Sequence, residues 1–120
     1  MNVWFGVSAS SIERPNHSWW CVSKTAAIND LLLIYAKGQG IVRVELIKSA
    51  PEIRERRCAE TRLLTVDTAL VKKLKTPISA RQLRTDAVLH RLPAVRRNFQ
   101  GTCFRVPPEL WPKLKLLIGL

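Results

Sequence analysis

The sequence predicts an α+β fold: a mixed, mostly antiparallel sheet of five to six strands, curled into a small barrel, with short helices at the joints and a C-terminal helix. Two observations support this prediction. Strand-like segments follow one another along the chain as hairpins, without the long helical crossovers that parallel sheets require. The 120 residues are 47% hydrophobic and 24% charged, which is the composition of a single folded domain with its own core.

The first strand is predicted over residues 2–7, where every second residue is Val or Phe. Polar residues 8–11 follow as a turn. Two adjacent tryptophans, Trp19 and Trp20, then lie in a second extended segment, 18–23. Because neighbouring side chains of an extended chain point to opposite faces, one indole can fill the core while the other faces a pocket or solvent.

The clearest hairpin in the chain joins residues 31–35 to residues 41–47. The first of these segments is continuously apolar, and a turn with two glycines separates it from the second. The second segment alternates, which places its valines and Leu46 on one side and Arg43 and Glu45 on the other.

The second half of the chain alternates strands with short helices. A strand is predicted over 63–71 and ends by Thr76-Pro77, and a helix over 80–83 is capped by Ser79. A helical turn from Asp86 to Leu89, a basic loop over 91–101 and a strand over 102–106 follow. Pro107-Pro108 opens the last helix, whose apolar stripe consists of Leu110, Trp111, Leu114, Leu117 and Ile118.

The chain is strongly basic, with 20 Lys and Arg against nine Asp and Glu and a net charge of +11. Residues 72–120 hold eleven of the basic residues and two of the acidic ones. This bias favours a polyanionic partner, nucleic acid first and an anionic membrane surface second. A solvated basic surface and a basic face that meets an acidic protein are the alternatives.

The three cysteines, Cys21, Cys58 and Cys103, are far apart and form no CxxC or Cys/His cluster, so neither zinc nor another cofactor is expected. We interpret them as reduced residues of a cytoplasmic protein. The first residues do not resemble a signal peptide, and no apolar run is long enough to span a membrane.

Motifs of enzyme sites are absent from the sequence. It contains no GxGxxG, GxxxxGK[ST], HExxH or GxSxG pattern. The two histidines, His17 and His90, could pair with cysteines only if the fold brought them together, and most acidic residues have arginine neighbours. The sequence therefore predicts no catalytic residue and favours a binding protein over an enzyme.

Aromatic and basic residues that flank the predicted turns are the candidate binding residues. An aromatic face can stack on a nucleobase, and cations beside it can hold phosphates. The aromatic candidates are Trp20, Tyr35 and Phe99. The basic candidates are Lys24, Lys37, Arg81, Arg84, Arg96 and Arg97.

Seven short motifs occur in an order that is similar to a known family. They are Val3-Trp4-Phe5, Trp20-Cys21-Val22, the segment Asn29 to Tyr35, Gly40-Ile41-Val42 with Val44-Glu45, Leu74 to Ile78, Arg97 to Gly101, and Pro108-Glu109-Leu110-Trp111. Together they resemble the EVE domain, a relative of the YTH domain within the PUA-like superfamily. The resemblance spans nearly the whole of 1–120.

The resemblance implies a single PUA-like pseudo-barrel that binds DNA or RNA through a modified, for example methylated, base flipped into an aromatic pocket. Trp20 would form one wall of this pocket, and Cys21 would offer a backbone group to the base. Ser8, Ala9 and Ser10 would read the edge of the base.

YTH domains place a second tryptophan in the loop before the long central strand. The corresponding residues here, 49–61, lack tryptophan, and Tyr35 or Phe99 could form that wall instead. Some relatives are fused to nuclease or motor modules, which could also be partners of this chain. An enzyme that acts on nucleotides or RNA remains an alternative.

Overall fold

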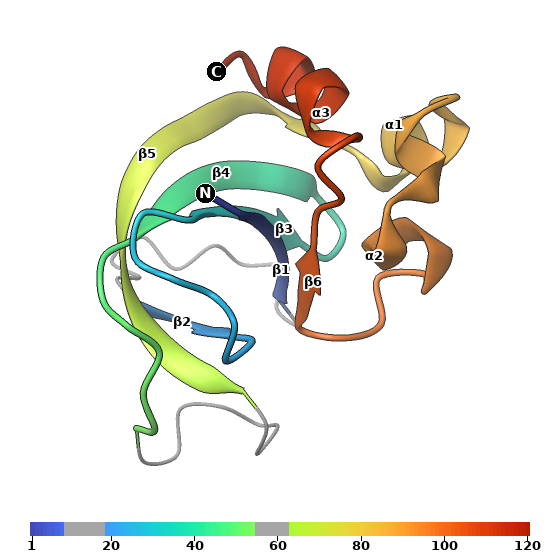
Figure 1. The fold of residues 1–120 in the computed structure, drawn as a ribbon. Coiled ribbons are helices and arrows are strands. Elements are labelled where there is room, and N and C mark those ends of the chain that lie inside the picture. The colour runs from blue at the N-terminus through green and yellow to red at the C-terminus, as the bar shows by residue number, and fades with distance from the viewer. Residues whose placement is uncertain (9–18, 55–62) are drawn as a thin grey trace.

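A six-stranded sheet, curled into a half-barrel, dominates the computed structural model, which describes residues 1–8, 19–54 and 63–120 (Figure 1). The order of strands across the sheet is β2-β5-β4-β3-β1-β6. The strands are β1 (Val3–Ser8), β2 (Trp19–Val22), β3 (Leu31–Ala36), β4 (Gly40–Ile47), β5 (Leu64–Ile78) and β6 (Cys103–Arg105).

The pairing of the strands confirms a mixed, mostly antiparallel sheet. Only β1 and β3 run parallel among the described pairs, whereas β1–β6, β2–β5, β3–β4 and β4–β5 are antiparallel. The predicted hairpin is the pair β3–β4. Gly40 closes its turn with a φ of +114°, and a Cβ at this position would lie 2.1 Å from the carbonyl oxygen of Ile78, so no larger residue fits there.

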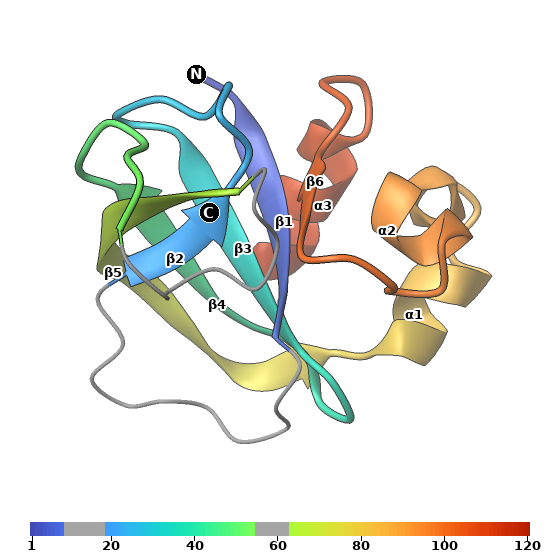
Figure 2. The ribbon, with the colours of Figure 1, turned by 90° about the horizontal axis from the view of Figure 1, so that it is seen from below.

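The two faces of the sheet pack against different partners. One face, here called the helix-covered face, packs against apolar residues of the short helices and includes Phe5, Leu33 and Tyr35. The opposite face, here called the inner face, includes Trp4 and Leu32 and closes on itself, because the curl of the sheet lays β2 over it (Figure 2). The alternation predicted over residues 2–7 thus divides β1 between two cores.

Asp30 fixes the chain just before β3. Its buried carboxylate accepts hydrogen bonds from the backbone N–H groups of Asn2 and Ala27 and from Nε1 of Trp4, at 2.9–3.0 Å. Asn29, with a φ of +73°, makes the turn that was predicted here. These bonds hold the start of β1 against the start of β3, which supports the parallel pairing.

The alternation predicted for β4 is wrong in one respect. Arg43 and Glu45 are both buried and form an ion pair with an Nε–Oε2 distance of 2.5 Å. Val42 and Val44, expected on one side, belong to the cores of opposite faces. Shifts in the β4–β5 register around these residues break the simple two-residue period.

Four short helical segments follow β5: α1 (Ala80–Thr85), the 3₁₀ helix η1 (Leu89–Arg91), α2 (Pro93–Arg96) and α3 (Trp111–Ile118). Ser79 caps α1 as predicted, in a capping box with Gln82. The Asp86 carboxylate accepts hydrogen bonds from the backbone N–H groups of Leu89 and Val88, which lower its pKa. Among the described residues, no helix combines the length and the apolarity that crossing a bilayer requires.

Three boundaries predicted in this half of the chain are wrong. β5 continues through Pro77 to Ile78, although a strand end was expected before it. The expected basic loop 91–101 contains α2, which has Pro93 in its first turn. The last helix begins at Trp111, after Pro107-Pro108.

Candidate functional site

Trp20 lies on the inner face of the sheet and is only partly buried. It pairs with Val66 across β2 and β5 and packs against the inner-face core. Its indole lies over Gly6 of β1, so close that a Cβ on Gly6 would be 2.6 Å from Nε1 and 3.0 Å from Cε2. Gly6 therefore provides the space in which the indole rests.

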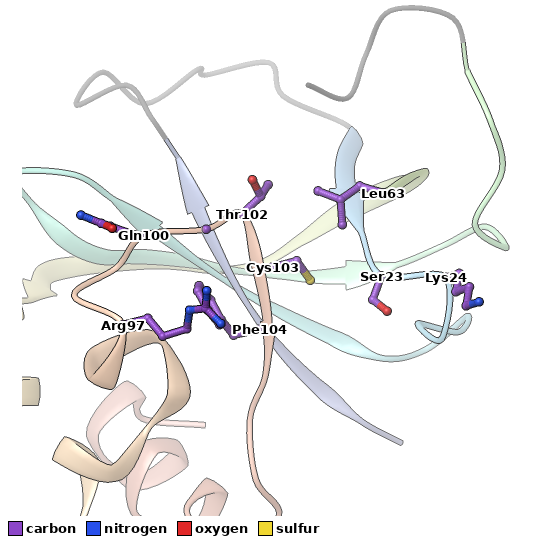
Figure 3. Close-up of a pocket in the computed structure, with 9 residues that line it drawn as sticks. Ser23, Lys24, Leu63, Arg97, Gln100, Thr102, Cys103 and Phe104 are labelled. Atoms are coloured by element: carbon purple, nitrogen blue, oxygen red, sulfur yellow. The ribbon is translucent and has the colours of Figure 1, made fainter. Parts of the chain in front are cut away.

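A pocket of about 590 Å³ lies where the two ends of the sheet meet (Figure 3). Strands β2 and β6 are the outermost strands in the sheet order, yet the curl brings the end of β2 beside β6. We call this cavity the seam pocket. The described residues that line it are Ser23, Lys24, Leu63, Arg97, Gln100, Gly101, Thr102, Cys103 and Phe104.

The seam pocket lies next to the indole of Trp20, although Trp20 is not among its lining residues. Gly6, which lies under the indole, pairs with Cys103 between β1 and β6. Cys103 lines the pocket and packs, like Trp20, against the inner-face core. The indole and the pocket are therefore neighbours across one residue pair of the sheet.

The described lining of the seam pocket is positively charged. Lys24 and Arg97 are the cations among these residues, and none of them is acidic. Burial raises the pKa of the Cys103 thiol to about 11, against the opposing effect of a backbone hydrogen bond with Ser23. At neutral pH the thiol is therefore uncharged, and the described lining combines two cations with neutral polar groups.

The expectation that Tyr35 or Phe99 forms a wall facing Trp20 is wrong. Both rings are buried in the core of the helix-covered face, where they stack on each other with centroids 4.3 Å apart and planes 6° apart. Arg84 lies over the Phe99 ring, 5.3 Å from its centroid. Burial also raises the pKa of Tyr35, with Arg84 opposing the shift. Neither ring can meet a base that lies on Trp20.

The six candidate phosphate-binding residues are dispersed over the molecule. Only Lys24 and Arg97 line the seam pocket. Arg81 and Arg84 belong to α1, and Arg84 donates a hydrogen bond to Oδ1 of Asn98. Arg96 is exposed at the end of α2, and Lys37 is exposed in the turn between β3 and β4.

The remaining candidates differ in their surroundings. Ser8 is the last residue of β1 and is partly buried. Ala9 and Ser10 lie outside the described residues, as do His17 and Cys58. Cys21 is buried and disulfide-bonded, so the interpretation of all three cysteines as reduced is wrong for this one, whereas Cys103 is free.

The sequence did not indicate most of the pocket. Ser23, Gln100, Thr102 and Cys103 lie at the ends of predicted strands or loops, where polar residues are common and carry no special signal. Within the described part of the chain, no group of three or more His, Cys, Asp or Glu is placed to hold a metal ion. Among the described residues, the site is a cationic cavity beside a partly buried indole.

Neither a protein-family model nor a curated protein matches the sequence. Solved structures with the same fold do. A protein of Agrobacterium tumefaciens is 14% identical, with a TM-score of 0.75 over 100% of this chain and 94% of that one. A protein of Pseudomonas syringae is 16% identical, with a TM-score of 0.74 over 96% and 98% of the two chains.

A third structure, of a protein from Rhodopseudomonas palustris, is 17% identical, with a TM-score of 0.74 over 99% of this chain and 94% of that one. At these identities the likeness shows the fold alone. The chain therefore has an α+β, barrel-like fold, a mixed sheet of six strands with a few short helices, that these bacterial proteins also have.

Proposed function

We propose that this protein is an EVE-like member of the PUA-like superfamily that binds nucleic acid and reads a modified base against Trp20. The observation that supports the proposal is the position of Trp20: its partly buried indole lies on the inner face, beside a cavity lined by Lys24 and Arg97. The net charge of +11 supports a polyanionic ligand.

The physical reasons concern the two kinds of contact. Stacking of a base on an aromatic face is worth about 1–3 kcal/mol, and a methyl group on the base adds apolar contact with the indole. Flipping a base out of its strand costs a few kcal/mol, so contacts between the protein and the flipped base must contribute at least as much binding free energy. Cations beside the indole add affinity that is independent of sequence and sensitive to salt.

The test is a fluorescence titration of short oligonucleotides, matched in sequence, with and without a modified base. The native protein should bind at least one modified oligonucleotide about tenfold or more tightly than its plain partner, the ratio that a difference of about 1.4 kcal/mol in contact energy with the indole provides. Trp20→Ala should reduce that ratio to about one and leave weak, salt-sensitive binding. Trp19→Ala, on the same strand, is the matched control and should keep the ratio.

Unchanged discrimination in Trp20→Ala would contradict the proposal. If heparin competes as well as oligonucleotides, and no modification is preferred, the basic face instead meets polyanions in general. A thiol-dependent enzyme finds little support at this site, because Cys21 is disulfide-bonded and Cys103 is protonated at neutral pH.

A further inference from the structure

We propose that the seam pocket holds the sugar–phosphate backbone of a single nucleic-acid strand, with Lys24 and Arg97 bound to different phosphates. The inference rests on the proposed function for the class of ligand. The inference specifies where the nucleic acid lies, that it is bound as a single strand, and that Lys24 and Arg97 are the cations that hold its phosphates.

The lining of the pocket favours an anion. Lys24 and Arg97 carry positive charge, and no carboxylate among the described lining residues opposes them. Cys103, at the wall between them, is neutral at physiological pH because burial raises its pKa. The volume of about 590 Å³ falls within the range of about 300–1,000 Å³ in which proteins bind small ligands.

The arrangement of the cations favours a chain over a single ion. Lys24 follows the end of β2, whereas Arg97 follows α2, and the two lie toward opposite ends of the pocket (Figure 3). Between them lie Cys103 and Ser23, with the Sγ atom directed toward the serine. Two separated cations with neutral polar groups between them suit successive phosphates joined by a sugar.

The position of the pocket explains why such a strand would also reach Trp20. Cys103 pairs with Gly6, and the indole lies over Gly6. A base that leaves the strand and stacks on the indole therefore has its neighbouring phosphates at the seam. Because DNA and RNA share this backbone, the pocket need not distinguish them.

The experiment measures the salt dependence of binding of unmodified single-stranded DNA and RNA oligonucleotides. For single strands, the slope of log K against log salt is negative, and its magnitude falls by about 0.7 for each phosphate contact that is lost. Lys24→Ala and Arg97→Ala should each reduce the magnitude of the slope by about 0.7, and the double variant should reduce it by about 1.4, because contacts with separate phosphates add.

Arg96→Ala is the matched control, because Arg96 is exposed and adjacent to Arg97 but does not line the pocket. It should leave the slope within about 0.2 of the native value, since it loses no direct phosphate contact. Trp20→Ala should also leave this slope unchanged. Lys24 and Arg97 are exposed, so these variants should fold, and circular dichroism checks that they do.

Three results would overturn the inference. If the double variant reduces the magnitude of the slope no more than either single variant does, both cations hold one phosphate. If Arg96→Ala reduces the slope as much as Arg97→Ala does, the cations act as a diffuse positive field. If Lys24→Ala and Arg97→Ala weaken the binding of poly-glutamate as much as that of the oligonucleotides, the pocket binds an acidic peptide.

The two proposals fail separately. If the slopes change as expected and no base modification is preferred, the backbone site stands and the reading of a modified base does not. If discrimination depends on Trp20 and the slopes do not change, the reverse holds.

Discussion

Among the residues of the site, Cys103 has the most unusual environment. It is a free thiol at the wall of a cationic pocket, a position that would activate a more exposed cysteine by favouring its thiolate. Here burial outweighs the opposing backbone hydrogen bond with Ser23 and raises the pKa to about 11. Cys103 therefore behaves as a small, neutral wall of the pocket.

This environment predicts how alkylation of Cys103 by iodoacetamide depends on pH. Because the thiolate is the reactive form, the rate should rise about 90-fold between pH 8 and pH 10 for a pKa of about 11. A thiol with the ordinary pKa of 9.0 gains only about tenfold over the same range. Mass spectrometry of the Cys103 peptide, with glutathione as the reference thiol, measures both rates.

The same shift affects stability. Because the pKa of the folded thiol lies above its ordinary value, the contribution of Cys103 to stability is complete below about pH 9 and is lost as the pH rises toward about 11.

In the alkylation experiment, a rate that rises only about tenfold between pH 8 and pH 10 would show that the Cys103 thiol is not buried as described.

The backbone near the pocket shows why aromatic candidates are difficult to judge from sequence. Asn98 and Phe99 both have left-handed φ values, +54° and +58°, which non-glycine residues seldom adopt in succession. This turn directs the Phe99 ring into the core against Tyr35, while Arg97 and Gln100 stay at the pocket. Lys24 and Arg97 could be proposed from sequence because long cations next to turns are usually exposed.

At the scale of elements, the site depends on the contact between β2 and β1, in which Trp20 of β2 packs on Gly6 of β1. The indole of Trp20 occupies the space above Gly6, so the two strands approach each other without being paired in the sheet. This contact closes the inner face. Because Gly6 pairs with Cys103, the contact also positions the indole next to Cys103. A larger residue at position 6 would separate the two strands.

Gly6→Ala should therefore destabilise the protein by about 1–3 kcal/mol, the usual effect of overpacking, and weaken discrimination of a modified base. Urea denaturation measures the first effect. In a Trp20→Phe background, where the smaller ring leaves room, Gly6→Ala should cost clearly less. Equal costs in the two backgrounds would show that the indole does not rest on Gly6.

The elements themselves were predictable to different degrees. The β3–β4 hairpin follows from a continuous apolar run, a glycine turn and an alternating run, and it was predicted correctly. The extent of β5 was predicted wrongly. A proline usually indicates the end of a strand, but pairing with Ile41 extends β5 beyond Pro77 to Ile78. The helix α2 was missed because it is only four residues long.

At the scale of the whole molecule, the seam pocket exists only because the sheet closes. Its walls come from the end of β2 and from β6, which lie at opposite ends of the sheet order and far apart in sequence. Local patterns predict strands, but they do not predict which edges the curl brings together. For this reason the cations were predicted and the cavity between them was not.

The central claim is that a modified base lies on Trp20. The most direct measurement is the set of four indole N–H resonances in a ¹H–¹⁵N spectrum, with that of Trp20 assigned from the Trp20→Phe variant. The account predicts that a preferred modified oligonucleotide shifts the Trp20 resonance strongly, by the ring current of the stacked base, and that its plain partner shifts it much less. Equal shifts with both oligonucleotides, or a response confined to the other three tryptophans, would contradict it.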